Sequence, residues 1–107
     1  MNIKEEILEH TNRGLEIFCF YMPIDFVPKR NFRNPLYKDK RASCNIYLDT
    51  KSQCYRMKDF GNEAYSGDCF WFAATMLGLD VRSDFKKVLL TIIQDLNLNI
   101  TMDFKTD

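Results

Sequence analysis

Apolar residues recur every three or four positions through the first part of the chain, which is the spacing of helices that bury one face. The pattern predicts one short helix over residues 3–12 and a second over residues 15–22. Gly14 separates the two segments, and Pro23 ends the second because proline disfavours helical backbone in the residue before it. Two helices are therefore expected at the N-terminus.

Two further helices are predicted in the C-terminal third. Residues 68–77 are apolar on almost every side, which is typical of a helix buried at the centre of a domain. Ser66 or Asp68 is the expected N-cap of this helix, and Gly78 is the expected stop. Apolar residues return at helical spacing over residues 84–96, which predicts a last helix with one buried face.

The middle of the chain alternates in the manner of β-strands. Residues 42–48 and 53–58 are rich in strand-forming side chains and are separated by a short turn, so they predict an antiparallel hairpin. Residues 29–33 alternate basic with aromatic or polar side chains and are predicted to form a third, exposed strand. The expected fold class is α+β, with a small antiparallel sheet of about three strands packed with about four helices.

A chain of 107 residues, 46% of them apolar, has the size of one domain with a modest core. We expect residues 1–107 to form a single domain, in which residues 1–27 supply N-terminal helices, residues 28–61 a basic β-hairpin platform and residues 66–97 C-terminal helices. The chain lacks both a run of about 18 apolar residues and an apolar signal core at its N-terminus. A cytoplasmic protein without membrane contact is therefore expected.

Charge is distributed unevenly, although the 15 basic and 15 acidic residues cancel. Residues 28–58 carry nine basic and two acidic side chains, a net charge of +7, whereas the segments on either side are net acidic. Clustered Lys and Arg side chains are what phosphate binding requires. A solvated hairpin whose charges keep its edges soluble would show the same pattern, so charge alone leaves both interpretations open.

Motifs for catalysis and metal binding are missing from the sequence. The four cysteines are separated by 25, 10 and 15 residues, so no C-x-x-C pair exists, and His10 is the only histidine. No phosphate-binding loop or nucleophile elbow is present. Asp59 and Asp68 could hold Mg²⁺, but they are interpreted as the end of a strand and the cap of a helix. Neither catalysis by this chain nor a bound cofactor is expected.

Four short motifs follow one another in the second and third quarters of the chain. They are residues 34–37 (NPLY), residues 38–43 (KDKRAS), residues 54–57 (CYRM) and residues 66–70 (SGDCF). Their order and spacing resemble those of the zinc-binding domain at the N-terminus of DnaG-type DNA primases of bacteria, phages and mobile elements. That family has C-P-x-H, a charged loop with D-K-x-P-S, a hairpin, C-x-x-C-G, and G-G-D opening an apolar helix. The resemblance covers residues 28–97 and implies a zinc-ribbon-like finger.

The metal-ligand positions of that family are degenerate here, because Asn34, Tyr37, Cys54 and Met57 occupy them. One thiolate cannot hold a structural zinc ion, so the resemblance implies a finger that has lost its metal. Tyr37, Met57 and Phe60 are expected to fill the vacated volume. The fold is accordingly expected to survive chelators.

The resemblance implies that the chain recognises single-stranded template DNA in DNA replication or mobile-element priming. Its partners would be single-stranded DNA and a primase catalytic domain, not contained in this chain, or a replicative helicase. Exposed rings such as those of Phe32, Tyr47 or Tyr55 would stack on bases while basic side chains hold phosphates. The nucleic-acid-binding candidates are Lys29, Arg30, Arg33, Lys38, Lys40, Arg41, Arg56 and Lys58.

The alternative function is that of a non-catalytic protein–protein interaction module. Such a module would dock on a replication protein or self-associate through its sheet. A module that contacts phosphates loses affinity steeply with added salt, whereas one that contacts only protein need not respond in this way. Salt dependence therefore separates the two functions.

Overall fold

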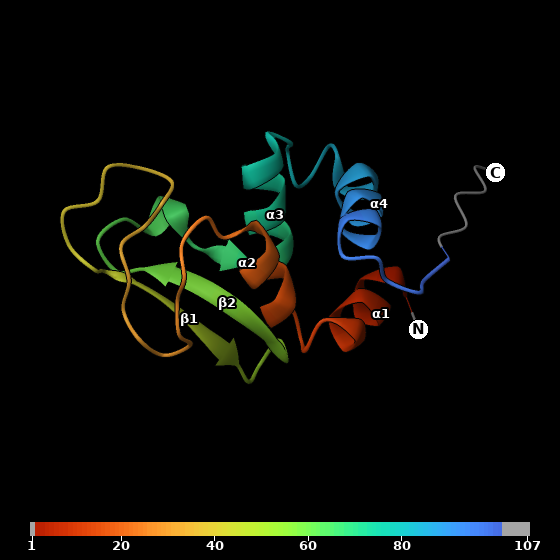
Figure 1. Ribbon diagram of the computed structural model, residues 1–107, viewed down its shortest axis with the longest axis horizontal. Helices are drawn as coiled ribbons and strands as arrows, with labels where there is room; N and C mark the ends of the chain where they lie inside the picture. Colours follow the sequence, from red (N-terminus) through yellow and green to blue (C-terminus); the bar gives the residue numbers. More distant parts are fainter. Residues whose placement is uncertain (1, 102–107) are drawn as a thin grey trace.

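The computed structural model describes residues 2–101, which form four α-helices and a three-stranded antiparallel sheet (Figure 1). In chain order the elements are α1 (Ile3–His10), α2 (Leu15–Tyr21), β1 (Cys44–Asp49), β2 (Cys54–Asp59), β3 (Gly67–Asp68), α3 (Cys69–Leu77) and α4 (Phe85–Asp95). One turn of 3-10 helix at Glu63–Tyr65 precedes β3. The predicted α+β fold class is confirmed, and each predicted helix lies within two residues of its expected bounds.

The predicted hairpin forms the larger part of the sheet. β1 and β2 pair along their full length, from Cys44 opposite Asp59 at one end to Asp49 opposite Cys54 at the other. β3 pairs with the other edge of β2, so the strand order is β1-β2-β3. β2 is therefore the central strand, and its pairing on both edges sets the register of the whole sheet.

The prediction of a strand over residues 29–33 is wrong. This segment makes one isolated bridge to β1, between Phe32 and Cys44. Lys29 adopts a φ of 68°, in the left-handed region that extended strands do not use. The third strand is instead β3, two residues that lead directly into α3.

The core joins the hairpin to α2 and α3 in one cluster of buried side chains. Ile46 of β1 and Met57 of β2 face each other across the strands, and both are buried. Phe18 of α2 packs against Phe72 of α3, with ring centroids 5.4 Å apart. The buried residues of α3 are Cys69, Phe70, Phe72, Ala73 and Ala74, which confirms the predicted central helix.

The ends of α3 also follow the sequence prediction. The side chain of Asp68 accepts a hydrogen bond of 2.9 Å from the backbone N–H of Trp71, so Asp68 is the N-cap. Gly78 caps the C-terminus in a left-handed conformation. Because Asp68 also belongs to β3, the cap fixes the helix directly to the sheet.

The hairpin and the loop that leads into it form one end of the molecule, and α1 and α4 lie together at the other (Figure 1). α2 and α3 lie between these two ends. The basic segment is thus concentrated at the end that carries the sheet. No helix within residues 2–101 has the length and apolar character needed to cross a membrane.

Gly14 is a point of close packing between the start of α2 and α3. Its φ is +94°, and a Cβ added there would lie 2.7 Å from Sγ of Cys69. Gly14→Ala is expected to lower the free energy of unfolding by about 1–2 kcal/mol for the left-handed backbone. Overpacking of the core should add about 1–3 kcal/mol. The midpoint of urea unfolding measures the loss.

Gly78→Ala is the matched control for that variant. Gly78 also has a positive φ, of +70°, but nothing lies within 4 Å of an added Cβ. Only the backbone part of the loss, about 1–2 kcal/mol, is expected there. Equal losses for the two variants would contradict the close contact between Gly14 and Cys69.

Candidate functional site

A buried carboxylate, that of Asp59, stands where the loop before the hairpin meets the end of β2. Its side chain is fully buried and accepts four hydrogen bonds. The donors are Nδ2 of Asn34 (3.0 Å), the hydroxyl of Tyr37 (2.6 Å), Oγ of Ser43 (2.9 Å) and the backbone N–H of Gly61 (2.8 Å). The carboxylate therefore links three parts of the loop to the strand end.

The hydrogen bonds set the charge state of this centre. Burial alone would raise the pKa of Asp59, but the bonds from Tyr37, Asn34, Gly61 and Ser43 outweigh it and hold the pKa below its usual range. The hydrogen bond that Tyr37 donates to Asp59, together with burial, raises the pKa of Tyr37 to about 12. Asp59 is thus ionised and Tyr37 is protonated at neutral pH.

A second carboxylate, that of Asp39, orders the loop from within. It accepts hydrogen bonds from the backbone N–H groups of Asn34 (2.8 Å) and Arg41 (3.1 Å). The side-chain oxygen of Asn34 accepts from the N–H of Leu36 at 2.8 Å, which turns the amide nitrogen toward Asp59. The ring centroids of Tyr37 and Tyr65 lie 4.8 Å apart, so the two rings pack against each other. The loop is consequently held in one shape although it forms no helix or strand.

The four degenerate ligand positions do not meet in space. Asn34 and Tyr37 come together, but on Asp59 rather than on Cys54 and Met57. Met57 is buried opposite Ile46 in the core, as a space-filling residue. Asn34 and Tyr37 therefore meet a carboxylate at one end of β2, whereas Cys54, which the resemblance implies as part of the second ligand pair, lies at the other end.

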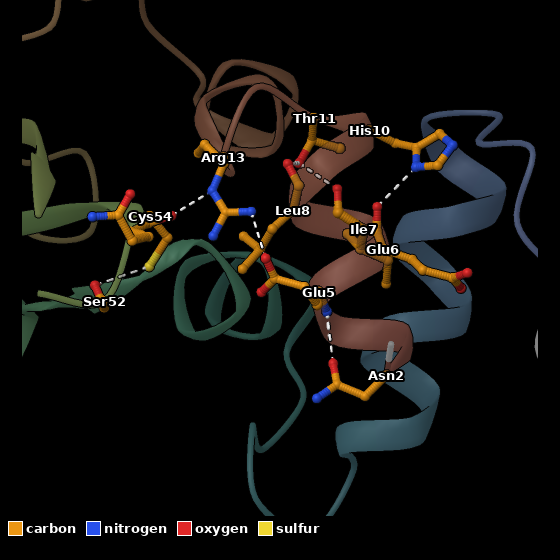
Figure 2. Close-up of polar contacts among 11 residues, drawn as sticks. Asn2, Glu5, Glu6, Ile7, Leu8, His10, Thr11, Arg13, Ser52 and Cys54 are labelled. Atoms are coloured by element: carbon orange, nitrogen blue, oxygen red, sulfur yellow. Dashed lines mark hydrogen bonds and ion pairs between the residues drawn. The ribbon is translucent and has the colours of Figure 1, made fainter. Parts of the chain in front are cut away.

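Cys54 lies at the opposite end of β2, beside Arg13 of the α1–α2 connection (Figure 2). Its Sγ is 3.2 Å from Oγ of Ser52. Arg13 donates to the carboxylate of Glu5 at 2.7 Å and to the carbonyl of Gln53. These contacts join α1 to the start of β2, so the surroundings of Cys54 are structural.

The residues around Asp59 do not fit a zinc ion. Asp39, Cys44 and Asp59 place their ligand atoms within 4.8 Å of one another. However, four hydrogen-bond donors already take the lone pairs of both Asp59 oxygens, whereas a metal requires a free lone pair. Burial and the charge of Asp59 raise the pKa of Cys44 to about 12, so in the absence of a metal this thiol stays protonated at neutral pH. The centre is a hydrogen-bonded anion.

Sequence reasoning identified Asp59 as the end of a strand but missed its role as the centre of this network. The signal is the hairpin register, which places Asp59 opposite Cys44 and next to the polar loop. The register depends on which turn residues close the hairpin. An error of a few residues in the predicted turn would therefore pair Asp59 with a different residue of β1 and hide its closeness to the polar loop.

None of the predicted basic residues forms an ion pair within the part of the chain that the structure describes. Within residues 2–101 the structure gives one ion pair, between Arg13 and Glu5, and neither belongs to the predicted set. Arg56 and Lys58 are half-buried and the other six are exposed: Lys29, Arg30, Arg33, Lys38, Lys40 and Arg41. The ammonium group of Lys58 lies 5.1 Å from the ring centroid of Phe60. All eight candidate side chains are therefore at least partly accessible to solvent.

Part of this charge surrounds a hollow on the outer face of the hairpin. Tyr47 pairs with Arg56, and alternation along the strands puts Lys58 on the same face. The hollow has a volume of about 270 Å³, and Ser66 and Glu63 also line it. A ring and two cations thus lie together at one opening.

Two aromatic predictions are wrong in opposite directions. Phe32 is only 8% exposed and packs against Phe26, with ring centroids 5.6 Å apart, so it cannot stack on a base. Phe60, predicted to fill the core, is 64% exposed. Tyr47 and Tyr55 are both half-buried, but they alternate onto opposite faces of the hairpin. Tyr47 and Phe60 are therefore the rings available at the basic surface.

Asp59→Asn tests the importance of the buried carboxylate. Replacing the shared acceptor with an amide leaves buried donors unpaired, so unfolding should become easier by about 3 kcal/mol at neutral pH. Asp49→Asn, at the other end of the hairpin, is the control, because its carboxylate accepts exposed hydrogen bonds from the backbone N–H and the hydroxyl of Ser52. A loss at Asp59 no larger than that at Asp49 would contradict the proposed centre.

Acid should reduce the advantage of the wild-type chain over Asp59→Asn. The pKa of Asp59 is lower in the folded state than its ordinary value of about 3.9, so its stabilisation is complete above that value. It is lost as the pH falls toward the folded-state pKa. The difference in unfolding free energy should shrink between about pH 5 and about pH 2. A constant difference would show that the charge does not contribute.

Chelation should leave the fold unchanged, because the donors around Asp59 replace what a metal would supply. We expect the same thermal midpoint with EDTA, with added Zn²⁺ and with neither, and no stoichiometric zinc by elemental analysis. A zinc content near one ion per chain, or unfolding by EDTA, would contradict the hydrogen-bonded centre.

Comparisons of the chain with protein-family models, with curated proteins and with solved structures found no match. What the basic surface does must therefore be inferred from its own charges, rings and contacts.

Proposed function

We propose that the chain binds single-stranded DNA through the basic end of the molecule. The observation that carries the proposal is the set of eight cationic side chains that form no ion pair within residues 2–101, two of which lie beside the rings of Tyr47 and Phe60. A cluster of like charges repels itself, and a phosphate backbone relieves this repulsion while it releases counterions. The role also fits the degenerate primase finger that the sequence resembles.

The loop before the hairpin is suited to phosphate contact. Lys38, Lys40 and Arg41 are exposed on a backbone that Asp39 and Asp59 hold in place. An ordered loop loses less conformational entropy when it binds than a flexible one does. The buried carboxylate thereby supports binding without touching the ligand.

The exposed rings favour a single strand over a duplex. Bases can stack on a protein ring only when they are not stacked and paired within a double helix. Tyr47 and Phe60 offer such rings next to Arg56 and Lys58, which can hold the neighbouring phosphates. Stacking on a ring tolerates any base, so weak sequence preference is expected.

The biological setting we propose is template binding in DNA replication or mobile-element priming, in the cytoplasm. A primase catalytic domain or a replicative helicase would be the protein partner. No catalytic step is assigned to this chain. The protonated Cys44 and the fully bonded Asp59 support a binding role, since neither offers a free nucleophile or base.

Protein docking is the second candidate function, and exposed apolar side chains favour it. Phe20, Ile24 and Val27 are 53%, 41% and 53% exposed, and they follow one another at the end of α2 and in the next loop. Large exposed apolar side chains that are close in sequence can contribute to a surface that another protein covers. This surface contains none of the eight basic residues, so mutations can separate the two functions.

Charge reversal tests the DNA-binding proposal. Arg41→Glu and Arg56→Glu each replace an attraction of about 1 kcal/mol to a phosphate 4 Å away with a repulsion of similar size. Affinity for an oligothymidylate should fall roughly tenfold or more at low salt. Fluorescence anisotropy at several salt concentrations measures both the affinity and its salt dependence.

Lys51→Glu is the matched control, because Lys51 is exposed in the hairpin turn and lies outside the proposed set. It should bind nearly as well as the wild type. Absence of binding by the wild-type chain to any oligonucleotide at low salt would overturn the proposal. Loss of a protein complex, with DNA binding unchanged, would favour the docking function.

A further inference from the structure

A second hollow continues from the one on the outer face of the hairpin. It has a volume of about 320 Å³ and lies where β3, the start of α3, α1 and the α3–α4 connection come together. Its basic side chains are Lys4, Arg56 and Arg82, and its half-buried rings are those of Trp71 and Phe85. It therefore repeats the combination of cations and aromatic rings found beside Tyr47.

The two hollows share part of their walls. Arg56 and Ser66 line both of them. Arg56 is also the residue that pairs with Tyr47 on one side and with Asp68 on the other. A strand that lies on the outer face of the hairpin can therefore enter the second hollow past Arg56.

The net charge of the second hollow is positive. Lys4 and Arg82 are exposed, and neither forms an ion pair with another described residue. The ammonium group of Lys4 lies 5.5 Å from the ring centroid of Phe70. The carboxylate of Asp68 is directed to the helix, where it accepts the N–H of Trp71. Three cationic side chains and one carboxylate thus line the hollow, and that carboxylate already accepts a hydrogen bond from the helix.

The rings of this hollow have fixed positions. A Cβ on Gly67 would lie 2.8 Å from the ring of Trp71, so the indole packs directly on the β3 backbone. Phe85 meets Phe70 edge to face, with centroids 6.0 Å apart. Held rings stack on a base with little loss of side-chain entropy.

We propose that the second hollow extends the DNA path, so that a single strand runs from Tyr47 past Arg56 to the α3–α4 connection. Lys4 and Arg82 bind phosphates there, and Trp71 or Phe85 stacks on a base. The inference rests on the proposed function and names a part of the surface outside the basic segment of the sequence. Charge complementarity and the shared wall select a phosphodiester strand as the occupant.

Intrinsic fluorescence tests this path directly, because Trp71 is the only tryptophan of the chain. Oligothymidylate of about 12 nucleotides, which is long enough to pass both hollows, should quench it on binding. Lys4→Ala/Arg82→Ala should weaken binding and reduce the slope of log affinity against log salt by about 0.7 for each lost phosphate contact. Lys51→Ala should leave both the quenching and the slope as in the wild type.

The outcomes separate the path from the function. Binding by anisotropy without a change in Trp71 fluorescence, and with an unchanged slope in the double variant, would overturn the path and leave the proposed function standing. No binding by the wild-type chain would overturn both. If polyglutamate of similar charge quenches Trp71 and displaces the DNA equally well, the occupant is an acidic peptide and the path is also overturned.

Discussion

The hydrogen-bonded carboxylate of Asp59 is the interaction on which the basic end of this protein depends. It is the point where the loop before the hairpin, the end of β2 and the turn after it are joined. A loop of this kind has no repeating backbone hydrogen bonds of its own, so its order must come from side chains. Because the acceptor is charged and buried, each donor is needed, and loss of one leaves the others around a poorly solvated charge.

A metal cation could also join the loop to the end of β2, but it would bind opposite kinds of atoms. A zinc ion gathers lone pairs from four ligands, whereas Asp59 gathers hydrogen atoms from Asn34, Tyr37, Ser43 and Gly61. Both arrangements cross-link a loop to a strand end. The anionic one also places buried negative charge beneath a surface rich in Lys and Arg. That charge reduces the mutual repulsion of the cations, although none of them pairs with it.

Local sequence patterns were sufficient for most of the fold and insufficient for the junction. Helical spacing, the cap at Asp68 and the stop at Gly78 depend on neighbouring residues, and the structure agrees with them. The position of the third strand was predicted wrongly, because β3 is only two residues long and leads directly into a helix, so it shows no alternating pattern of its own. The contact of Asn34 and Tyr37 with Asp59 was not predicted, because it depends on the hairpin register. That register brings the polar loop to Asp59 and sends Cys54 to the opposite end of the strand.

The direction in which the aromatic rings point follows from the same hairpin register. Asp59 points inward at the end of β2, so the next residue, Phe60, points outward beside Lys58. Phe32 points inward because its one bridge to Cys44 places it on the core side of the sheet. An inward Phe32 completes the core, whereas an exposed Phe60 contributes little to it. A large ring held in solvent next to a cationic side chain has a physical rationale as part of a surface that contacts bases and phosphates.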